Sequence, residues 1–311
     1  MRIVSAADVE AALDFASLVE RLRQAFRRDI VVPLRHHHTV ETPDGVDATL
    51  LLMPAWQTGR HIGIKMVTIF PGNAERGLPA VMGAYLLLDG ETGSPLAMID
   101  GPMLTARRTA AASALAASYL ARPDCERLLM VGTGTLAPQL ILAHAAVRPI
   151  RNVLVWGRTE DKAAKLAKRL NRSDFRVQHT TDLEDAARGA HIISCATLSA
   201  EPLIAGEWLQ NGQHLDLVGG FRPDMRETDD MAIRRARVFV DTRAGACTEA
   251  GDIVQPLESG VLDPDDIAAD LFELTRGERA GRRFYDQITL FKSVGTAIED
   301  LAAAQLTVER V

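Results

Sequence analysis

The chain has 311 residues, which is long enough for two domains or one large one with an ample core. Apolar residues make up 47% and charged residues 24%, and the formal charge of −6 offers no general attraction to nucleic acid or to an anionic membrane. We expect neither partner and a cytoplasmic location, because no apolar run approaches a membrane span and the N-terminus does not resemble a signal peptide.

The first hundred residues predict a mainly antiparallel sheet with helices at its start. Ser5 can cap a helix from Ala6 to Leu13, and a second helix is predicted over 17–26. The sequence DGETG at 89–93 is typical of a hairpin. Because no parallel β-α-β pattern occurs here, we expect a domain separate from the rest of the chain. Its extended segments are predicted at 35–53, 61–70, 80–89 and 95–99.

Several polar residues in these strands could carry chemistry. His36, His37 and His38 look like a metal site, but neighbours in a strand point to alternate faces, so we expect no bound metal. Lys65 stands at the centre of an apolar strand, where it is either an edge-strand residue in water or a charge kept in a pocket. Arg35 also stands among apolar and aromatic neighbours.

An alanine-rich helix is predicted over 104–120, and its small side chains indicate close packing against another element. Arg107 and Arg108 fall in its first turn, against the preference of the helix dipole for negative charge there. We expect either an anion bound at this turn, which would relieve the repulsion, or an exposed pair of arginines.

The segment 128–137, with the sequence LLMVGTGTLA, has the form of a dinucleotide-binding loop: a strand, a tight glycine turn and a helix. Gly132 allows the sharp turn, and Gly134 lets the backbone approach a pyrophosphate because it has no Cβ. The phosphates would bind the unpaired N–H groups of the helix N-terminus. The expected cofactor-binding residues of this loop are Gly132, Thr133, Gly134, Thr135, Leu136 and Ala137.

The next predicted strand, over 152–156, ends where a residue normally contacts the cofactor ribose. An acidic residue there would accept from the 2′-hydroxyl of NAD, whereas this chain has Gly157, Arg158 and Thr159. A cation and a hydroxyl suit the 2′-phosphate of NADP, so we expect NADP(H) as the preferred cofactor and NAD(H) as the alternative. Arg158 could instead be a solvated surface arginine, and Thr159 can cap the next helix.

From residue 127 to about 283, strands and helices alternate, which predicts a doubly wound parallel sheet of the Rossmann type. We therefore expect an α/β fold with this domain over 120–287. An α+β, mainly antiparallel domain is expected over 1–119 with 288–311, because the last helix is expected to return to it. Thr197 and Val218 follow strands that end at the carboxyl edge of the sheet, where cofactors bind.

Five motifs make the chain similar to the ornithine cyclodeaminase/μ-crystallin family over essentially its whole length. They are GIK at 63–65, LLDGETGSPLA at 87–97, LTARRTAA at 104–111, GTGTLA at 132–137 and LFKSVGTAIED at 290–300.

The resemblance implies a homodimer built through the N-terminal domain and an active site between the domains. It also implies an amino-acid-like substrate with an α-carboxylate and a nitrogen on the α-carbon. In such enzymes, the residues matching Arg35, Lys65 and Arg108 hold the substrate carboxylate. That role explains three cations in apolar settings, because a desolvated carboxylate needs charge-assisted donors. Ser293 is expected either to line the cofactor pocket or to pack as a hydroxyl.

The chain departs from the pattern of the family's cyclodeaminases at one position, and this departure bears on which of the family's activities we expect. Cyclodeaminases carry an aspartate after the Val-Gly-Gly turn, where this chain has Phe221, which can neither accept a proton nor bind an ammonium group. Asp224 lies three residues further on. The Phe-Arg-Pro-Asp sequence resembles the reductase and μ-crystallin branch. Together with Arg158, it favours reduction of a cyclic imine over ammonia-releasing cyclisation.

The function we expect is NADPH-dependent reduction of a cyclic ketimine carboxylate, such as Δ1-pyrroline-2-carboxylate or Δ1-piperideine-2-carboxylate, to proline or pipecolate. The cofactor delivers hydride to the C=N carbon, and Lys65 or a bound water protonates the nitrogen. The alternatives are an ornithine cyclodeaminase, an alanine-type dehydrogenase and a non-catalytic NADPH-dependent binding protein. The last of these should keep the glycine loop but lose the cations.

Overall fold

Two compact units make up the protein in a computed structural model, which describes every residue except Asp44 and Arg172 and the side chains of Ala74 and Glu75. The N-terminal unit comprises Met1–Arg108 and Ala297–Val311, and the Rossmann unit comprises Thr109–Thr296. The expected α/β class is confirmed. The unit boundaries differ from the expected ones because strand 289–292 belongs to the parallel sheet and helix 101–120 runs across the division.

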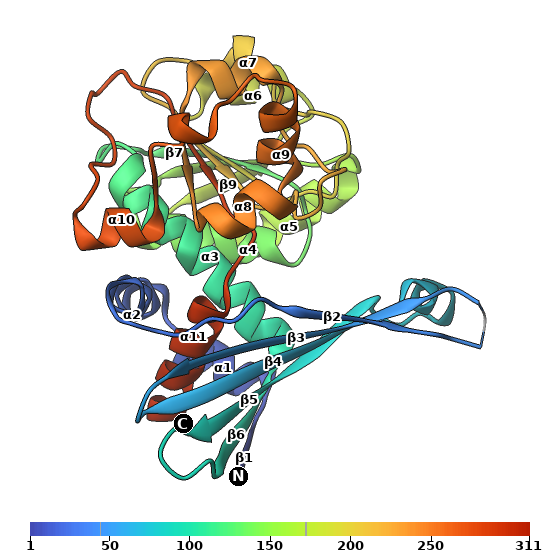
Figure 1. The fold of residues 1–311 in the computed structure, drawn as a ribbon. Helices are drawn as coiled ribbons and strands as arrows, with labels where there is room; N and C mark the ends of the chain where they lie inside the picture. The colour runs from blue at the N-terminus through green and yellow to red at the C-terminus, as the bar shows by residue number, and fades with distance from the viewer. Residues whose placement is uncertain (44, 172) are drawn as a thin grey trace. The chain divides into compact units, whose positions relative to one another are not determined.

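A six-stranded sheet forms the centre of the N-terminal unit, in the order β1-β6-β5-β4-β3-β2 (Figure 1). Its strands pair antiparallel except for β1, which runs parallel to β6. The extended segment expected over 35–53 is therefore two paired strands with a turn between them. The strands are β1 (Arg2–Val4), β2 (His36–Val40), β3 (Ala48–Gln57), β4 (His61–Ile69), β5 (Val81–Asp89) and β6 (Pro95–Asp100), and the short 3-10 helix η1 (Pro71–Arg76) follows β4.

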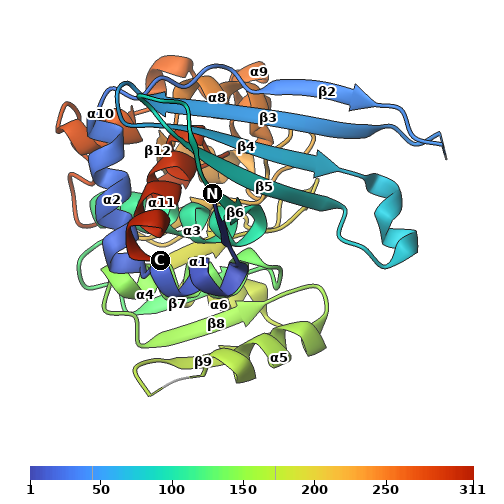
Figure 2. The same cartoon turned by 90° about the horizontal axis from the view of Figure 1, so that it is seen from below.

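The C-terminal helix α11 (Ala297–Arg310) packs on this sheet, as expected for a last helix that returns to the first domain. It contacts β3, β4 and β5 and also the helices α1 (Ala6–Ala12) and α2 (Phe15–Arg27) (Figures 1 and 2). Most of its side chains are buried, because these neighbours cover it on several sides. Ser5 caps α1 and forms a capping box with Asp8, which confirms the predicted helix start.

The Rossmann unit is built on an eight-stranded sheet in which every described pairing is parallel, in the order β13-β12-β14-β11-β10-β7-β8-β9. The chain runs from β7 to β8 and β9, which Figure 2 shows side by side, and then returns to β10 on the other side of β7. The topological switch point therefore lies between β7 and β10. The strands are β7 (Arg127–Val131), β8 (Asn152–Trp156), β9 (Arg176–His179), β10 (Ile192–Cys195), β11 (His214–Leu217), β12 (Arg237–Val240), β13 (Ala269–Asp270) and β14 (Thr289–Lys292).

The long helix α3 (Gly101–Leu120) begins earlier than predicted, so Arg107 and Arg108 lie in its interior and not in its first turn. Thr159 precedes helix α5, but its side chain makes no capping hydrogen bond. The helices after α3 are α4 (Leu136–Val147), α5 (Glu160–Leu170), α6 (Leu183–Gly189), α7 (Asp230–Arg235), α8 (Arg243–Glu249), α9 (Gly251–Glu258) and α10 (Leu271–Arg276), with 3-10 helices η2 (Gly206–Trp208) and η3 (Pro264–Asp266).

Buried polar side chains connect the sheet of the Rossmann unit to α4. His144 Nε2 lies 3.0 Å from Asp216 Oδ2, and Ser194 Oγ donates to the same oxygen at 2.7 Å. His214 on β11 contacts Thr289 through Nδ1 at 3.0 Å. Burial lowers the pKa of His214 to about 3 although the Asp216 charge opposes the shift, so the folded protein keeps this imidazole neutral at neutral pH.

This histidine makes stability depend on pH. Unfolded histidine has a pKa of 6.5, so below that value the unfolded chain binds a proton that the folded chain excludes. We expect its contribution to be complete above pH 6.5 and to fall by about 1.4 kcal/mol per pH unit towards pH 3. Because His214→Asn cannot titrate, its unfolding free energy should show a shallower slope in this range. Identical slopes in denaturant titrations at several pH values would contradict this role.

Candidate active site

Two cations and two carboxylates meet inside the N-terminal unit. Lys65 Nζ lies 2.7 Å from Asp300 Oδ2, and Arg108 Nε lies 2.8 Å from Asp300 Oδ1. Arg108 Nη1 lies 2.6 Å from Glu299 Oε2. None of the four side chains is more than 6% exposed, so these are buried ion pairs. We call Lys65, Arg108, Glu299 and Asp300 the charge cluster.

The strand alternation of β4 places Gly63 and Lys65 on its buried face. Tyr85 lies directly opposite Lys65 on β5, and its side chain is 1% exposed. A Cβ at Gly63 would lie 1.8 Å from Tyr85 Oη, so only glycine leaves room for this ring beside the lysine. The carboxylates come from α11, which packs on β3, β4 and β5.

The pKa values of the charge cluster follow from burial and from the paired charges. Burial lowers the pKa of Lys65 to about 8, the Asp300 carboxylate opposes the shift, and the guanidinium charges of Arg108 and Arg35 add to it. Burial alone would raise the pKa of Asp300, but Arg108 and Lys65 hold it below its usual value. For Arg108, burial acts to lower the pKa, and the charges of Asp300 and Glu299 outweigh it and raise the pKa. Lys65 is thus a cation that can release its proton in a moderately alkaline solution.

The structure decides between the interpretations that the sequence left open for these cations. Lys65 is a buried charge and not an edge residue in water. Arg108 pairs with carboxylates of this chain, and Arg107 donates to the Leu13 carbonyl and stacks on the Phe15 ring at 4.1 Å. The expectation of an exposed arginine pair was therefore wrong, and the binding of an external anion stays a prediction. Arg35 is half-buried just before β2. The binding of a substrate carboxylate by these residues stays a prediction.

Glu299 and Asp300 were missed as site residues, although their sequence belongs to the last of the family-like motifs. They stand in the segment AIEDLAAAQL, in which nearly every other residue is small or apolar. Two adjacent acids in such a helix are fully buried here, which is expensive unless cations face them. Two adjacent acids among small and apolar residues are therefore the sequence feature from which Glu299 and Asp300 could have been predicted as site residues.

The predicted dinucleotide loop lies where expected, between β7 and α4 in the Rossmann unit. Gly132 has φ +120°, and a Cβ there would lie 2.5 Å from the Ala196 carbonyl oxygen. A Cβ at Gly134 would meet nothing within 4 Å, so this position faces open space. Thr135 precedes α4 and makes no side-chain capping bond, while the Ala137 N–H donates to the Gly134 carbonyl at 3.2 Å. A helix N-terminus without a side-chain cap suits an anion.

Gly134→Ala tests this loop without disturbing the fold. Because the added methyl group would meet no protein atom, we expect an unchanged melting temperature. The same methyl group would stand where a pyrophosphate approaches the backbone, so cofactor affinity should fall about tenfold or more. Titration of reduced cofactor by fluorescence measures this change. Gly132→Ala is the contrasting variant, which should lose stability through its positive φ and its contact with Ala196.

The other predicted cofactor residues follow neighbouring strands at the same carboxyl edge. Thr197 follows β10, Val218 follows β11, and Ser293 follows β14. Ser293 is 3% exposed, and its N–H donates to the Leu217 carbonyl at 3.2 Å. Arg158 and Thr159 are exposed after β8. The sheet order thus brings these segments together along one edge, while their contact with a cofactor stays a prediction.

Phe221 lies directly after the Gly219-Gly220 turn and is 46% exposed. Asp224 pairs with Arg222, whose Nε and Nη2 donate to its two carboxylate oxygens at 2.9 and 2.7 Å. His36, His37 and His38 are exposed on β2. Across the part of the chain that the structure describes, no group of three or more His, Cys, Asp or Glu side chains is placed to hold a metal ion.

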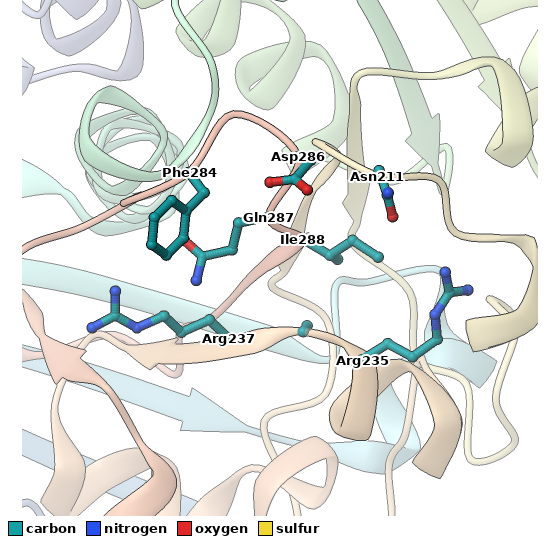
Figure 3. Close-up of a pocket in the computed structure, with 8 residues that line it drawn as sticks. Asn211, Arg235, Arg237, Phe284, Asp286, Gln287 and Ile288 are labelled. Carbon is teal, nitrogen blue, oxygen red and sulfur yellow. The ribbon is translucent and has the colours of Figure 1, made fainter.

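A cavity of about 460 Å³ opens at the opposite, amino edge of β12 and β14, away from the predicted cofactor residues. Its two arginines, Arg235 and Arg237, point apart (Figure 3). Each already donates to a backbone carbonyl, that of Gly206 and of Gly281 respectively. These cations do not converge on a common ligand, so the cavity offers no anion site.

The chain is similar to known proteins over its whole length. The sequence profile of the ornithine cyclodeaminase/mu-crystallin family matches residues 1–311. A Delta(1)-pyrroline-2-carboxylate reductase from Colwellia psychrerythraea is 38% identical over 321 aligned positions, which cover 100% of this chain and 99% of the relative. The described residues contain no helix with the length and apolar character that a membrane crossing requires.

Two solved structures are similar over the whole chain. The Delta(1)-pyrroline-2-carboxylate reductase of Thermococcus litoralis, in complex with NADH and L-proline, is 34% identical with a TM-score of 0.92 and covers 100% of this chain and 97% of its own. An archaeal alanine dehydrogenase dimer with bound NAD is 30% identical with a TM-score of 0.91 and covers 100% and 95%. This chain therefore belongs to the ornithine cyclodeaminase/mu-crystallin family.

Proposed function

We propose that the protein is an NAD(P)H-dependent oxidoreductase that reduces the C=N bond of a cyclic ketimine carboxylate, with Δ1-pyrroline-2-carboxylate as the first candidate. The observation that carries the proposal is the charge cluster, which keeps two buried cations in a chain closely related to reductases of this substrate. A non-catalytic binding protein of the family is expected to lose these cations. Phe221 argues against cyclodeamination, because it cannot handle the substrate amine.

Lys65, Arg108 and Arg35 are the residues proposed to hold the substrate carboxylate. The charges of Arg108 and Arg35 both act to lower the pKa of Lys65, against the larger opposing effect of the Asp300 charge. A bound carboxylate would relieve this repulsion and would gain charge-assisted hydrogen bonds. Asp300 holds Lys65 and Arg108 in fixed positions, which orients the substrate before reaction.

Lys65 is also the proposed proton donor to the imine nitrogen. A group with a pKa of about 8 is protonated at neutral pH and gives up its proton more readily than an ordinary lysine. A protonated imine accepts hydride better than a neutral one. The buried setting of Lys65 also keeps bulk water from competing for this proton.

A nicotinamide cofactor fits the Rossmann unit and would supply the hydride. The open space at Gly134 and the uncapped start of α4 suit a pyrophosphate, and Thr197, Val218 and Ser293 would line the rest of the edge. The two solved relatives bind NADH and NAD. For this chain we propose a preference for NADPH, because exposed Arg158 and Thr159 take the place of an acid at the ribose position.

A homodimer formed through the N-terminal unit is part of the proposal. Several large apolar side chains between residues 31 and 82 are exposed, including Leu34 at 86% and Val81 at 54%. Apolar surface of this kind favours a protein partner. Light scattering should give the mass of a dimer, and a monomer would contradict this part. A reducing, cytoplasmic compartment is proposed because Cys125, Cys195 and Cys247 are free thiols.

The test is a reduction assay with purified protein, Δ1-pyrroline-2-carboxylate or Δ1-piperideine-2-carboxylate, and NADPH or NADH. We expect loss of the absorbance of the reduced cofactor, formation of proline or pipecolate, and a preference for NADPH that Arg158→Ala removes. Δ1-Pyrroline, which lacks the carboxylate, should not be reduced. Ammonia release from ornithine, or reduction of pyruvate with ammonia, in the absence of imine reduction would overturn the proposal.

A further inference from the structure

A second set of buried charges lies in the Rossmann unit, beneath the carboxyl edge of its sheet. Glu227, Asp252 and Lys292 are all 0% exposed. Lys292 Nζ donates to Asp252 Oδ2 at 3.0 Å, and the other oxygen of Asp252 accepts from the backbone N–H groups of Glu227 and Thr228 at 2.7 and 3.2 Å. The Asp252–Lys292 pair thus fixes the backbone that carries Glu227.

The carboxylate of Glu227 in turn holds two loops at once. Its Oε1 accepts from the backbone N–H and the hydroxyl of Thr197, both at 2.8 Å, and its Oε2 accepts from the Gly219 N–H at 2.8 Å. Thr197 follows β10 and Gly219 follows β11, so one side chain sets the spacing between the ends of two adjacent strands. Three donors converge on it, which favours its ionised form although burial raises the pKa of Glu227.

The two glycines after Val218 are required by this arrangement. A Cβ at Gly219 would lie 2.0 Å from the Thr197 carbonyl oxygen and 2.6 Å from Glu227 Oε1. A Cβ at Gly220 would lie 2.8 Å from Asp252 Oδ2 and 3.3 Å from Lys292 Nζ. The backbone turn therefore lies directly against the buried charges, and no side chain separates them.

The loops that Glu227 holds belong to one half of the nucleotide-binding sheet. In a doubly wound fold, a dinucleotide lies across the switch point with one mononucleotide on each half. Here β7, β8 and β9 form the half with the glycine loop, and β10, β11 and β14 form the other. A cofactor with its pyrophosphate and adenosine side at the glycine loop would have its nicotinamide side at the loops after β10 and β11.

We infer that Glu227 is a positioning residue for the nicotinamide half of the cofactor, acting through Thr197 and Gly219 and supported by the Asp252–Lys292 pair. This inference rests on the proposed function in so far as it requires a nicotinamide cofactor. It assigns no direct contact between Glu227 and the cofactor. Its consequence is that changes at Glu227 affect the two halves of the cofactor unequally.

Glu227→Gln tests the inference, because the amide has nearly the same shape but only one acceptor oxygen. If that oxygen keeps Thr197, the amide NH2 faces the Gly219 N–H, and one buried donor loses its partner. The affinity for the preferred reduced cofactor should fall about ten- to hundredfold, while that for ADP-ribose with the matching 2′ group should stay within about twofold. Both are measured by calorimetry without substrate. Glu201→Gln, at an exposed position of the loop after β10, is the matched control and should change neither affinity.

The outcomes separate the inference from the proposed function. Wild-type protein that binds no nicotinamide cofactor would overturn the proposed function. Wild-type binding with equal loss of both ligands in Glu227→Gln, or with no loss of either, would overturn only the inference. A lower melting temperature with unchanged affinities would indicate a purely structural role and would also contradict it. Lys292→Met should reproduce the unequal loss, because it leaves Asp252 without its cation.

Discussion

Asp300→Asn is expected to lower the free energy of unfolding by about 3–5 kcal/mol, because it removes the charge that Lys65 and Arg108 share inside the protein. Glu299, which pairs with Arg108, would then be the remaining carboxylate of the charge cluster beside two buried cations. The loss should appear as a lower denaturation midpoint with an unchanged denaturant dependence. Activity should fall as well, since both cations lose the group that positions them.

The matched control for this prediction is Glu184→Gln, which breaks an ion pair with Arg188 on the surface of α6. The side chains of that pair are 50% and 42% exposed, so its removal should cost about 0–1 kcal/mol. Equal destabilisation by the two variants would mean that the charge cluster stabilises no better than a solvated pair. In that case, its burial would have to be explained by substrate binding alone.

Lys65→Met should lower kcat/KM for imine reduction by about 10²–10⁴, the range attributed to a positioned proton donor. The wild-type enzyme should lose activity as pH rises above about 8, because the ammonium group then releases its proton before the imine can take it. Each further pH unit should reduce kcat/KM about tenfold. The measurement is a pH profile of kcat/KM at constant ionic strength, with cofactor at saturation.

Two further variants make the result specific to Lys65. Lys165→Met changes an exposed lysine of α5 and should leave both the rate and the pH profile unchanged. Lys65→Arg keeps the positive charge but cannot deprotonate in this range, so whatever activity it retains should not fall above about pH 8. An unchanged alkaline limb in Lys65→Arg would assign the titration to another group and exclude Lys65 as the donor.

The sequence was informative where a local pattern has one physical explanation. The glycine loop at 132–137 predicted a strand, a turn and a helix, and the structure has β7, a turn at Gly132 and α4 there. Ser5 predicted a helix start, which its capping box with Asp8 confirms. The family resemblance, which the comparisons confirm, rested on motifs of the same local kind.

The sequence was less informative for charges whose partners lie far away in the chain. Lys65 and Asp300 are separated by most of the sequence, and only the packing of α11 on β4 brings them together. Arg108 was assigned to a helix N-terminus because the helix start was placed too late, whereas α3 begins at Gly101. In the structure, its guanidinium group pairs with Glu299 and Asp300 of the same chain.

By itself, therefore, the sequence determined the fold class, the nucleotide loop, the return of the last helix and the family, because each depends on periodicity or on a contiguous motif. Only the tertiary structure decided which charges are paired. A buried charge such as Lys65 or Glu227 is stabilised by groups that several elements supply, and their identity depends on sheet order and helix packing. No local pattern encodes that convergence, so the charge cluster and the Glu227 contacts were visible only in the folded protein.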